Sequence, residues 1–292
     1  MRCNILRHLA VSWSGVSEAA AILAGVFAIQ MAADAIHRDF AGHSDEGAHF
    51  VTGLMVHDYF ASAPGSSPLA FASEYYVRYP KVALGQWPPV FYGLQCIWYL
   101  LAGVSKTSAT VLVGLISATT IWCLYRRLRY ENGMAVAVVA TVVLLGQPLV
   151  QSLSVLVMAD MAACLCTLIA VFAFSDFLSS GNSRHIAFFA FWSSLAILTR
   201  PSALALAAFV PICLLVTGRL AVVRDRRVWG AGIAIGVLTA PFYLWSWCHG
   251  MGLHTHGSIS RLVSESVRIS RNYHATDAWM SVASGWLVAV AA

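Results

Sequence analysis

Long apolar runs separated by short polar segments recur along nearly the whole chain of 292 residues. A helix needs about 20 predominantly apolar residues to cross the hydrocarbon core of a membrane, so runs near this length predict membrane-spanning helices. The runs are 19–36, 88–103, 108–125, 134–157, 161–178, 186–199, 202–217 and 229–247. Together they predict an all-α fold, a polytopic bundle of transmembrane helices.

Composition supports this class, because 59% of the residues are hydrophobic and only 11% are charged, against about 25% charged in ordinary soluble domains. No polar block between the runs is large enough to fold separately. We therefore expect residues 1–292 to form one domain embedded in the lipid bilayer. The seven cysteines lack the spacing of a zinc site or a disulfide framework, which indicates small apolar packing residues.

Both ends of the chain bear on its completeness. Arg2 and Arg7 precede the first apolar run, and the segment 33–35 resembles the small-residue cleavage site of an export signal. We favour an uncleaved span, because 19–36 is longer than a typical signal core and further spans follow. At the other end, an apolar run stops at residue 292 before a span is complete, so we expect a fragment or a truncated form.

Lys and Arg residues in short loops predict the orientation, because such loops stay on the cytoplasmic side. The net charge of +5 comes from these clusters, so it indicates topology, and no nucleic-acid partner is expected. The predicted cytoplasmic residues are Arg2, Arg7, Arg126, Arg127, Arg129, Arg184, Arg219, Arg224, Arg226 and Arg227. The segments 37–87, 147–160 and 248–278 and the break at Arg200 then face outward, on the periplasmic or extracytoplasmic side of a cell membrane.

The run 88–103 conflicts with this orientation, because an outward loop 37–87 and a cytoplasmic Arg126 require an odd number of crossings between them. Either 88–103 enters the membrane only halfway, or the arginine cluster breaks the rule. We favour a half-entering segment, since Pro88 and Pro89 open the run and its 16 residues are few for a span.

The outward loop 37–87 combines aromatic residues with scattered charges. The aromatic residues include Tyr59, Phe60, Phe71, Tyr75, Tyr76, Tyr79 and Trp87. This composition is typical of helices that lie in the membrane interface, where aromatic rings prefer to sit. An aromatic belt without any further function is the alternative interpretation.

The adjacent carboxylates Asp45 and Glu46 follow the first predicted span and are flanked by His43 and His49. A charge held at membrane depth costs about 2.5–3.5 kcal/mol, so a charge near the end of a span needs a partner or a function. Two neighbouring carboxylates repel each other, which raises the proton affinity of one and suits a general base. The alternative is solvation of the loop, or capping of a helix that begins near Gly47.

Asp160 and Arg200 are two further charges at the ends of apolar runs. Pro201 breaks the helix beside Arg200, so the guanidinium can point into a cavity and bind an anionic group. The alternative is that Arg200 reaches the lipid headgroups. Asp160 opens a long apolar helix, where it either complements the helix dipole or faces the same cavity. The predicted orientation puts both residues on the same side as Asp45.

A divalent metal ion is an alternative role for His249, His254 and His256, since His-x-His can place two imidazoles near one ion. The neighbouring glycines and the lack of a nearby carboxylate in the sequence favour a mobile outward loop instead. We therefore expect no metal ligand set and no cofactor.

The order of these motifs resembles the C-type superfamily of integral membrane glycosyltransferases, near the protein mannosyltransferases and the bacterial aminoarabinose transferases. The resemblance runs from about Asp45 to Trp247, through the acidic pair, the aromatic loop, the Pro-Pro segment, the aspartate that opens a helix and the Thr-Arg-Pro break. It implies inverting transfer of a sugar from a polyprenyl-phosphate donor to an acceptor hydroxyl on the non-cytoplasmic face. The acceptor would be a glycolipid, a protein or a polysaccharide.

Carried over to this chain, the resemblance makes Asp45 the general base, with Glu46 beside it as a second catalytic carboxylate that tunes or positions the base. The leaving phosphate needs cationic stabilisation. The outward cations expected to bind the donor phosphate are Arg200, Lys81 and Arg78.

Asp160, His49 and Gln86 are expected to shape or support the cavity. The chain departs from the family pattern just before the Pro-Pro pair, where relatives often place Lys or His and this chain has Gln86 and Trp87. That departure puts the local phosphate contact in doubt and makes Lys81 a substitute by proximity only. Relatives also generally continue through additional spans.

A transporter or flippase for a lipid-linked or anionic substrate is the rival class, since it also uses charges within a membrane. Transporters tend to carry internal repeats and charges at the apolar centres of their spans. Here no convincing repeat is found and the charges gather at one face, so the glycosyltransferase is favoured. An inactive membrane scaffold is disfavoured by the intact pair Asp45 and Glu46.

Overall fold

The computed structural model describes residues 13–40, 43–83 and 85–248, and every regular element in those ranges is a helix. The predicted all-α class is therefore confirmed. The helices are α2 (Trp13–Ala32), α3 (Glu46–Ser62), α4 (Pro68–Arg78), α5 (Val90–Ala102), α6 (Lys106–Asn132), α7 (Met134–Leu145), α8 (Pro148–Val155), α9 (Asp160–Ser180), α10 (Ser183–Ile197), η1 (Pro201–Ala205), α11 (Leu206–Val216), η2 (Leu220–Arg224) and α12 (Arg226–Cys248).

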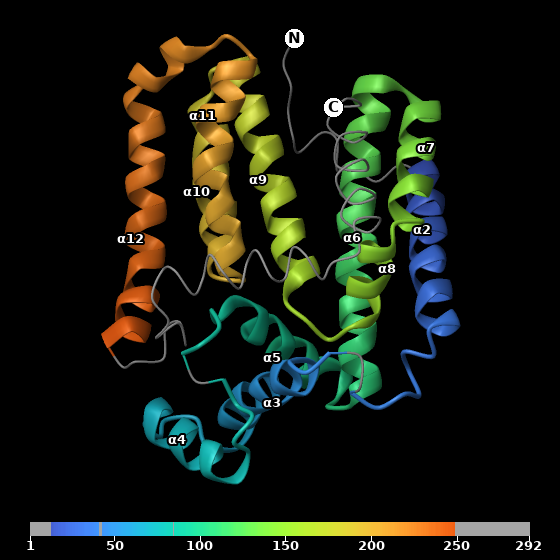
Figure 1. The fold of residues 1–292 in the computed structure, drawn as a ribbon, viewed down its shortest axis with the longest axis vertical. Coiled ribbons are helices and arrows are strands. Elements are labelled where there is room, and N and C mark those ends of the chain that lie inside the picture. The colour runs from blue at the N-terminus through green and yellow to red at the C-terminus, as the bar shows by residue number, and fades with distance from the viewer. Residues whose placement is uncertain (1–12, 41–42, 84, 249–292) are drawn as a thin grey trace, which may run out of the picture.

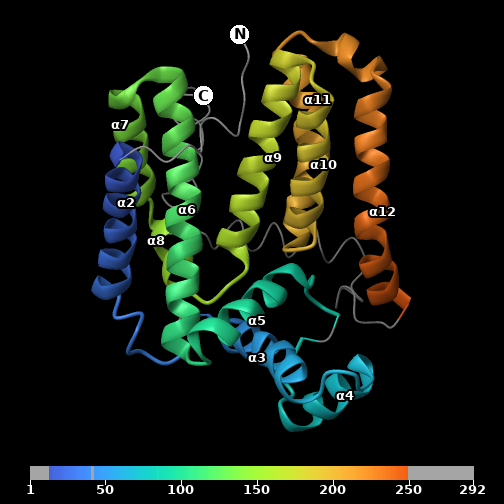
Figure 2. The same cartoon turned by 180° about the vertical axis from the view of Figure 1, so that it is seen from behind.

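Long helices stand side by side, and the shorter α3, α4 and α5 lie across one end of them (Figures 1 and 2). We call this the α3–α5 end. In the described part of the chain, the helices α2, α6, α9 and α12 are long and apolar enough to cross a membrane. The bent pair α7 and α8 adds a fifth crossing if the two helices are counted as one span. The protein is therefore a multi-pass membrane protein.

The helix α5 resolves the conflict between the outward loop and the arginine cluster. It has 13 residues, so at 1.5 Å per residue it is about 20 Å long and too short for a hydrocarbon core of about 30 Å. The chain leaves α2 and enters α6 at the α3–α5 end (Figure 1). The basic last turns of α6 therefore lie at the opposite end of the bundle, as the favoured interpretation of 88–103 requires.

The predicted spans differ from the helices of the structure in their bounds, most clearly at the first span and at 134–157. The first span runs over Trp13–Ala32 rather than 19–36. The run 134–157 was predicted as one span, but α7 and α8 meet at an angle of 67°. Pro148 cannot donate a helical hydrogen bond and Gln147 before it is extended, so the helix breaks at this point.

Buried polar side chains join the helices. Gln30 on α2 is fully buried and donates to the carbonyl oxygens of Thr110 (2.9 Å) and Ser154 (2.8 Å), which links α2 to α6 and α8. Away from the α3–α5 end, Arg127 of α6 donates to the buried Asp176 of α9 at 2.7 Å. These contacts give partners to the Gln30 amide nitrogen and to Oδ1 of Asp176, which would be costly to bury alone.

The close packing of α3 on α5 gives a prediction for stability. A Cβ atom at Gly53 would lie 2.3 Å from Oε1 and 3.1 Å from Cβ of the fully buried Gln95. We expect Gly53→Ala to destabilise the fold by about 1–3 kcal/mol, because overpacking forces side chains out of their rotamers. Gly47 on the same helix has no atom within 4 Å of such a Cβ, so Gly47→Ala is the matched control. Thermal unfolding in detergent measures both, and equal melting temperatures would contradict the prediction.

Candidate functional site

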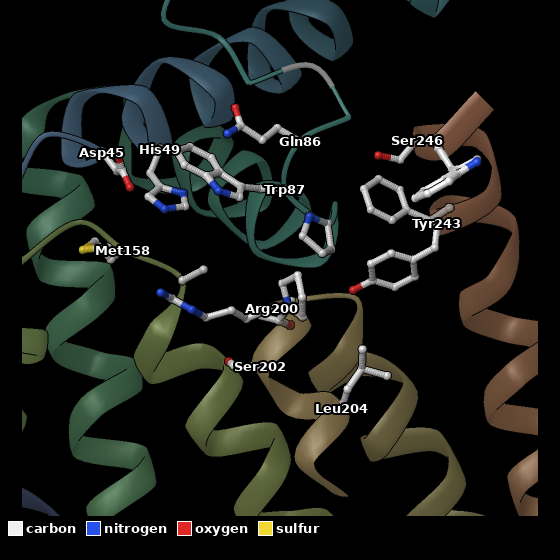
Figure 3. Close-up of a pocket in the computed structure, with 16 residues that line it drawn as sticks. Asp45, His49, Gln86, Trp87, Met158, Arg200, Ser202, Leu204, Tyr243 and Ser246 are labelled. Carbon is white, nitrogen blue, oxygen red and sulfur yellow. The ribbon is translucent and has the colours of Figure 1, made fainter. Parts of the chain in front are cut away.

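A cavity of about 790 Å³ lies between the α3–α5 end and the ends of the long helices (Figure 3). Its walls come from segments far apart in the sequence: the start of α3, the residues before α5, the connections before α9 and η1, and the end of α12. Ligand sites are typically concave and apolar with a few convergent polar groups, and this cavity fits that description. Its ionisable lining residues are Asp45, His49, Arg200 and Tyr243.

Asp45 lies at the cavity, immediately before the first residue of α3. Its side chain makes no capping hydrogen bond to the helix, so the capping interpretation does not explain the residue. The carboxylate is 46% exposed and accepts a hydrogen bond from the Ser44 hydroxyl at 3.2 Å. Asp45 therefore keeps an accessible carboxylate that can accept a proton or a hydrogen bond in the cavity.

Glu46 points elsewhere, although it is the next residue. Its side chain is fully buried, and its Oε1 accepts a hydrogen bond at 3.1 Å from the backbone N–H of Val157. Glu46 is absent from the cavity wall. It fastens the start of α3 to the connection between α8 and α9, so the geometry gives it a positioning role and does not place it beside the Asp45 carboxylate as a catalytic group.

His49 follows one turn after Asp45 on α3, so both side chains lie on the same side of the helix. Its Nδ1 forms a hydrogen bond of 2.8 Å with the Tyr92 hydroxyl, and its ring stacks on Trp87 with centroids 3.9 Å apart. Burial of the imidazole, followed by the nearby Arg200 charge, lowers the pKa of His49 to about 4. The ring is therefore neutral at physiological pH and acts through packing and hydrogen bonds.

Arg200 is the cation of the cavity. Its backbone is extended before Pro201, which begins the short helix η1, and at this break the side chain lines the cavity. The guanidinium pairs with Asp160 on the first turn of α9, and the two side chains are 36% and 18% exposed. The hydrogen bond between them uses Nη1 of a guanidinium that has five N–H donors, so Arg200 retains capacity to bind an anion.

A second cavity of about 460 Å³ lies on the bundle side of this ion pair. Its wall combines Asp160 and Arg200 with apolar side chains of α6, α7, α9 and α11, among them Leu124, Leu168 and Phe209. Arg200 borders both cavities. The guanidinium thus stands between a site with polar groups and an apolar pocket.

The structure brings together some of the predicted site residues and leaves others apart. Gln86 lines the first cavity, as expected of a cavity residue. Arg78 lies on α4, is 72% exposed and donates to Glu74 at 3.1 Å. Lys81 is also exposed, and neither cation belongs to the wall of either large cavity. Their predicted phosphate contact has no counterpart in this geometry.

The helix α12 was not predicted to contribute to the site, yet it supplies four residues to the cavity: Phe242, Tyr243, Ser246 and Trp247. Tyr243 donates to the carbonyl of Ile197 at 2.8 Å, and Ser246 donates to the carbonyl of Gly85 at 2.6 Å. Both hydrogen bonds hold α12 as a wall of the site. The only local signal was the aromatic density of 242–247, which is equally typical of a membrane interface.

Metal ligands were expected to be absent. Within 13–40, 43–83 and 85–248, no group of three or more His, Cys, Asp or Glu side chains is arranged to hold a metal ion. His249, His254 and His256, the alternative metal ligands, lie outside the described residues.

The fold and the site define a polytopic helical membrane protein in which a cavity with a few ionisable groups and an apolar pocket meet at an arginine. The family model described as dolichyl-phosphate-mannose-protein mannosyltransferase matches residues 86–245, more than half of the chain, and the chain belongs to this family. The predicted resemblance is confirmed. No curated protein and no solved structure matches the chain.

Family membership implies a membrane glycosyltransferase of the mannosyltransferase type, with a lipid-linked sugar donor and an acceptor for glycosylation. The matched residues include Gln86, Arg200 and most of the other residues of the cavity wall, and they also include Asp160. Asp45 and His49 precede the matched residues. Their assignment to the site comes from the geometry of the cavity.

Proposed function

We propose that this protein transfers a sugar from a polyprenyl-phosphate donor to an acceptor hydroxyl, with inversion at the anomeric carbon and with Asp45 as the general base. The observation that carries the proposal is that one cavity contains both Asp45 and Arg200 (Figure 3). A base for the acceptor and a cation for the leaving group are the two groups that such a displacement requires.

The chemistry balances with these two residues. The acceptor oxygen attacks the anomeric carbon, and the bond between that carbon and the phosphate oxygen breaks. The Asp45 carboxylate takes the proton of the acceptor hydroxyl, and the electron pair leaves with the carrier phosphate. Arg200 stabilises the charge that develops on the phosphate, while Asp160 holds the guanidinium in place.

The apolar pocket behind Arg200 supports a lipid carrier rather than a soluble sugar nucleotide. Its lining is predominantly aliphatic and aromatic and belongs to helices of the bundle, so isoprenoid chain buried there would gain about 25 cal/mol per Å² of apolar surface. In this proposal the phosphate sits at Arg200, the lipid chain enters the pocket, and the sugar projects into the larger cavity.

Orientation follows from the basic residues. Arg127 and Arg227 lie at the end of the bundle away from α3–α5, where Arg227 donates to the carbonyl of Gly181 at 2.6 Å between α9 and α10. The positive-inside rule assigns that end to the cytoplasm. We therefore assign the cavity to the non-cytoplasmic face of a cell membrane, with a glycolipid, protein or polysaccharide hydroxyl as acceptor. The proposal uses Arg200 as the cation and requires neither a metal ion nor nucleic acid.

The stereochemistry of the product tests the proposal directly. We expect purified protein, supplied with a polyprenyl phosphate β-mannose and an acceptor alcohol, to form an α-mannoside, because a single displacement inverts the anomeric centre. Nuclear magnetic resonance of the first product measures the configuration. A β-linked product would contradict a single displacement, and movement of the intact donor across vesicles without a new glycosidic bond would favour the transporter.

A further inference from the structure

Trp87 is held firmly at the wall of the cavity. Pro88 and Pro89 restrict the backbone that follows it, and the N–H of Val90 donates to the carbonyl of Leu198 at 3.0 Å. On the N-terminal side of Trp87, the carbonyl of Gly85 accepts a hydrogen bond of 2.6 Å from the Ser246 hydroxyl. The segment is therefore tied both to the end of α10 and to α12, which fixes the place of the indole.

One face of this indole is covered by the protein itself. The imidazole of His49 stacks on it at a centroid distance of 3.9 Å and an interplanar angle of 18°. His49 is only 3% exposed, and the Tyr92 hydroxyl holds its Nδ1 at 2.8 Å. Such a backing stiffens the ring, while Trp87 remains half-buried and lines the cavity.

The stack lines the same cavity as Asp45 and Arg200, the two groups to which the chemistry has been assigned. His49 is one helical turn from Asp45, and its imidazole is close enough to both Asp45 and Arg200 to be influenced by the charge of each. The group that passes from the phosphate to the acceptor must occupy the space between the cation and the base. That group is the sugar.

We propose that Trp87 is the platform on which the ring of the transferred sugar stacks, with His49 and Tyr92 as positioning residues behind it. This inference rests on the proposed function. A pyranose has an apolar face of C–H groups and a rim of hydroxyls, and the large flat indole suits the apolar face. A neutral aromatic pair also adds no charge that would compete with Arg200 for the phosphate.

The test compares two probes on Asp45→Asn protein, which holds the donor without turnover: a short-chain polyprenyl phosphate mannose and the same polyprenyl phosphate without sugar. We expect Trp87→Leu to lower the preference for the sugar-bearing probe about tenfold, comparable to the loss of one stacking contact. Affinity for the sugar-free probe should stay unchanged, because Arg200 is intact. Trp87→Phe, which restores a flat ring, should recover most of the preference.

Trp229→Leu is the matched control, since Trp229 lies in the first turn of α12, is 63% exposed and is absent from the walls of both large cavities. It should keep the preference for the sugar-bearing probe. An unchanged preference in Trp87→Leu would overturn the platform, and an equal loss of both probes would assign Trp87 to the carrier instead. In the Asp45-containing protein, a raised KM for the acceptor with an unchanged KM for the donor would assign it to the acceptor.

Failure of the platform and failure of the proposed function give different results. If the Asp45→Asn protein binds neither polyprenyl phosphate, the proposed donor is wrong. If it binds both probes with the same affinity before Trp87 is changed, the cavity does not recognise the sugar. Thermal unfolding detects a Trp87→Leu protein that does not fold. Trp87→Met, which also lacks a flat ring, then carries the comparison and should show the same loss of preference.

Discussion

Asp45→Asn is expected to abolish measurable transfer from a polyprenyl-phosphate sugar. An amide cannot accept the proton of the acceptor hydroxyl, and general-base catalysis contributes roughly 10²–10⁴-fold in rate. Because the Asp45 side chain is 46% exposed and makes no helix-capping bond, this nearly isosteric change should alter the free energy of unfolding by no more than about 0.5 kcal/mol. Initial rates with a labelled lipid-linked sugar measure the loss, and thermal unfolding in detergent measures the fold.

Glu74→Gln is a matched control for Asp45→Asn. This substitution also exchanges a carboxylate for an amide, but Glu74 lies on α4, away from the cavity. Its exposed salt bridge with Arg78 stabilises the fold by only about 0.2–1 kcal/mol. Its variant should retain wild-type transfer. If Asp45→Asn transfers sugar as fast as the wild type, the base is another group and the assignment of Asp45 fails.

The second large effect is expected at Arg200. Arg200→Gln removes the cation from the proposed phosphate site, and loss of one such stabilising group typically lowers the rate about 10²–10³-fold. We expect kcat/KM to fall by that order and the affinity for a sugar-free polyprenyl phosphate to fall with it. Arg200→Lys keeps the charge but loses the planar fork, so it should show a smaller loss of both quantities.

Stability must be separated from binding in this variant, because Arg200→Gln also leaves the part-buried Asp160 without its partner. Such an orphaned group costs about 1–3 kcal/mol, and thermal unfolding measures that cost independently. Arg78→Gln and Lys81→Gln complete the comparison, since the sequence predicted phosphate contacts for both. The geometry predicts less than about twofold change in kcat/KM for either variant, in line with exposed charges of little energetic weight. A large loss at Arg78 or Lys81 would restore the original interpretation.

The sequence alone singled out most of the charged residues of the candidate site, but not which of them contact one another. Asp160 and Arg200 were recognised as costly charges at span ends, and the structure pairs them across α9 and η1. The helix break at Pro201 was also foreseeable, because proline removes a backbone donor. By contrast, the contribution of α12 was invisible, since Tyr243 and Ser246 reach partners 46 and 161 residues away in the chain.

Amino-acid composition and hydrophobic run length determined that this is an all-α, multi-pass membrane protein, because the cost of burying charge and the length of a span are local properties of the chain. Only the tertiary structure decided what each charge faces. Asp45 and Glu46 are neighbours, yet successive residues of a helix point about 100° apart, so one carboxylate reaches the cavity and the other is buried against Val157. Helix phase and packing between distant segments, rather than proximity in sequence, separate the proposed base from its neighbour and Arg200 from the outward cations Arg78 and Lys81.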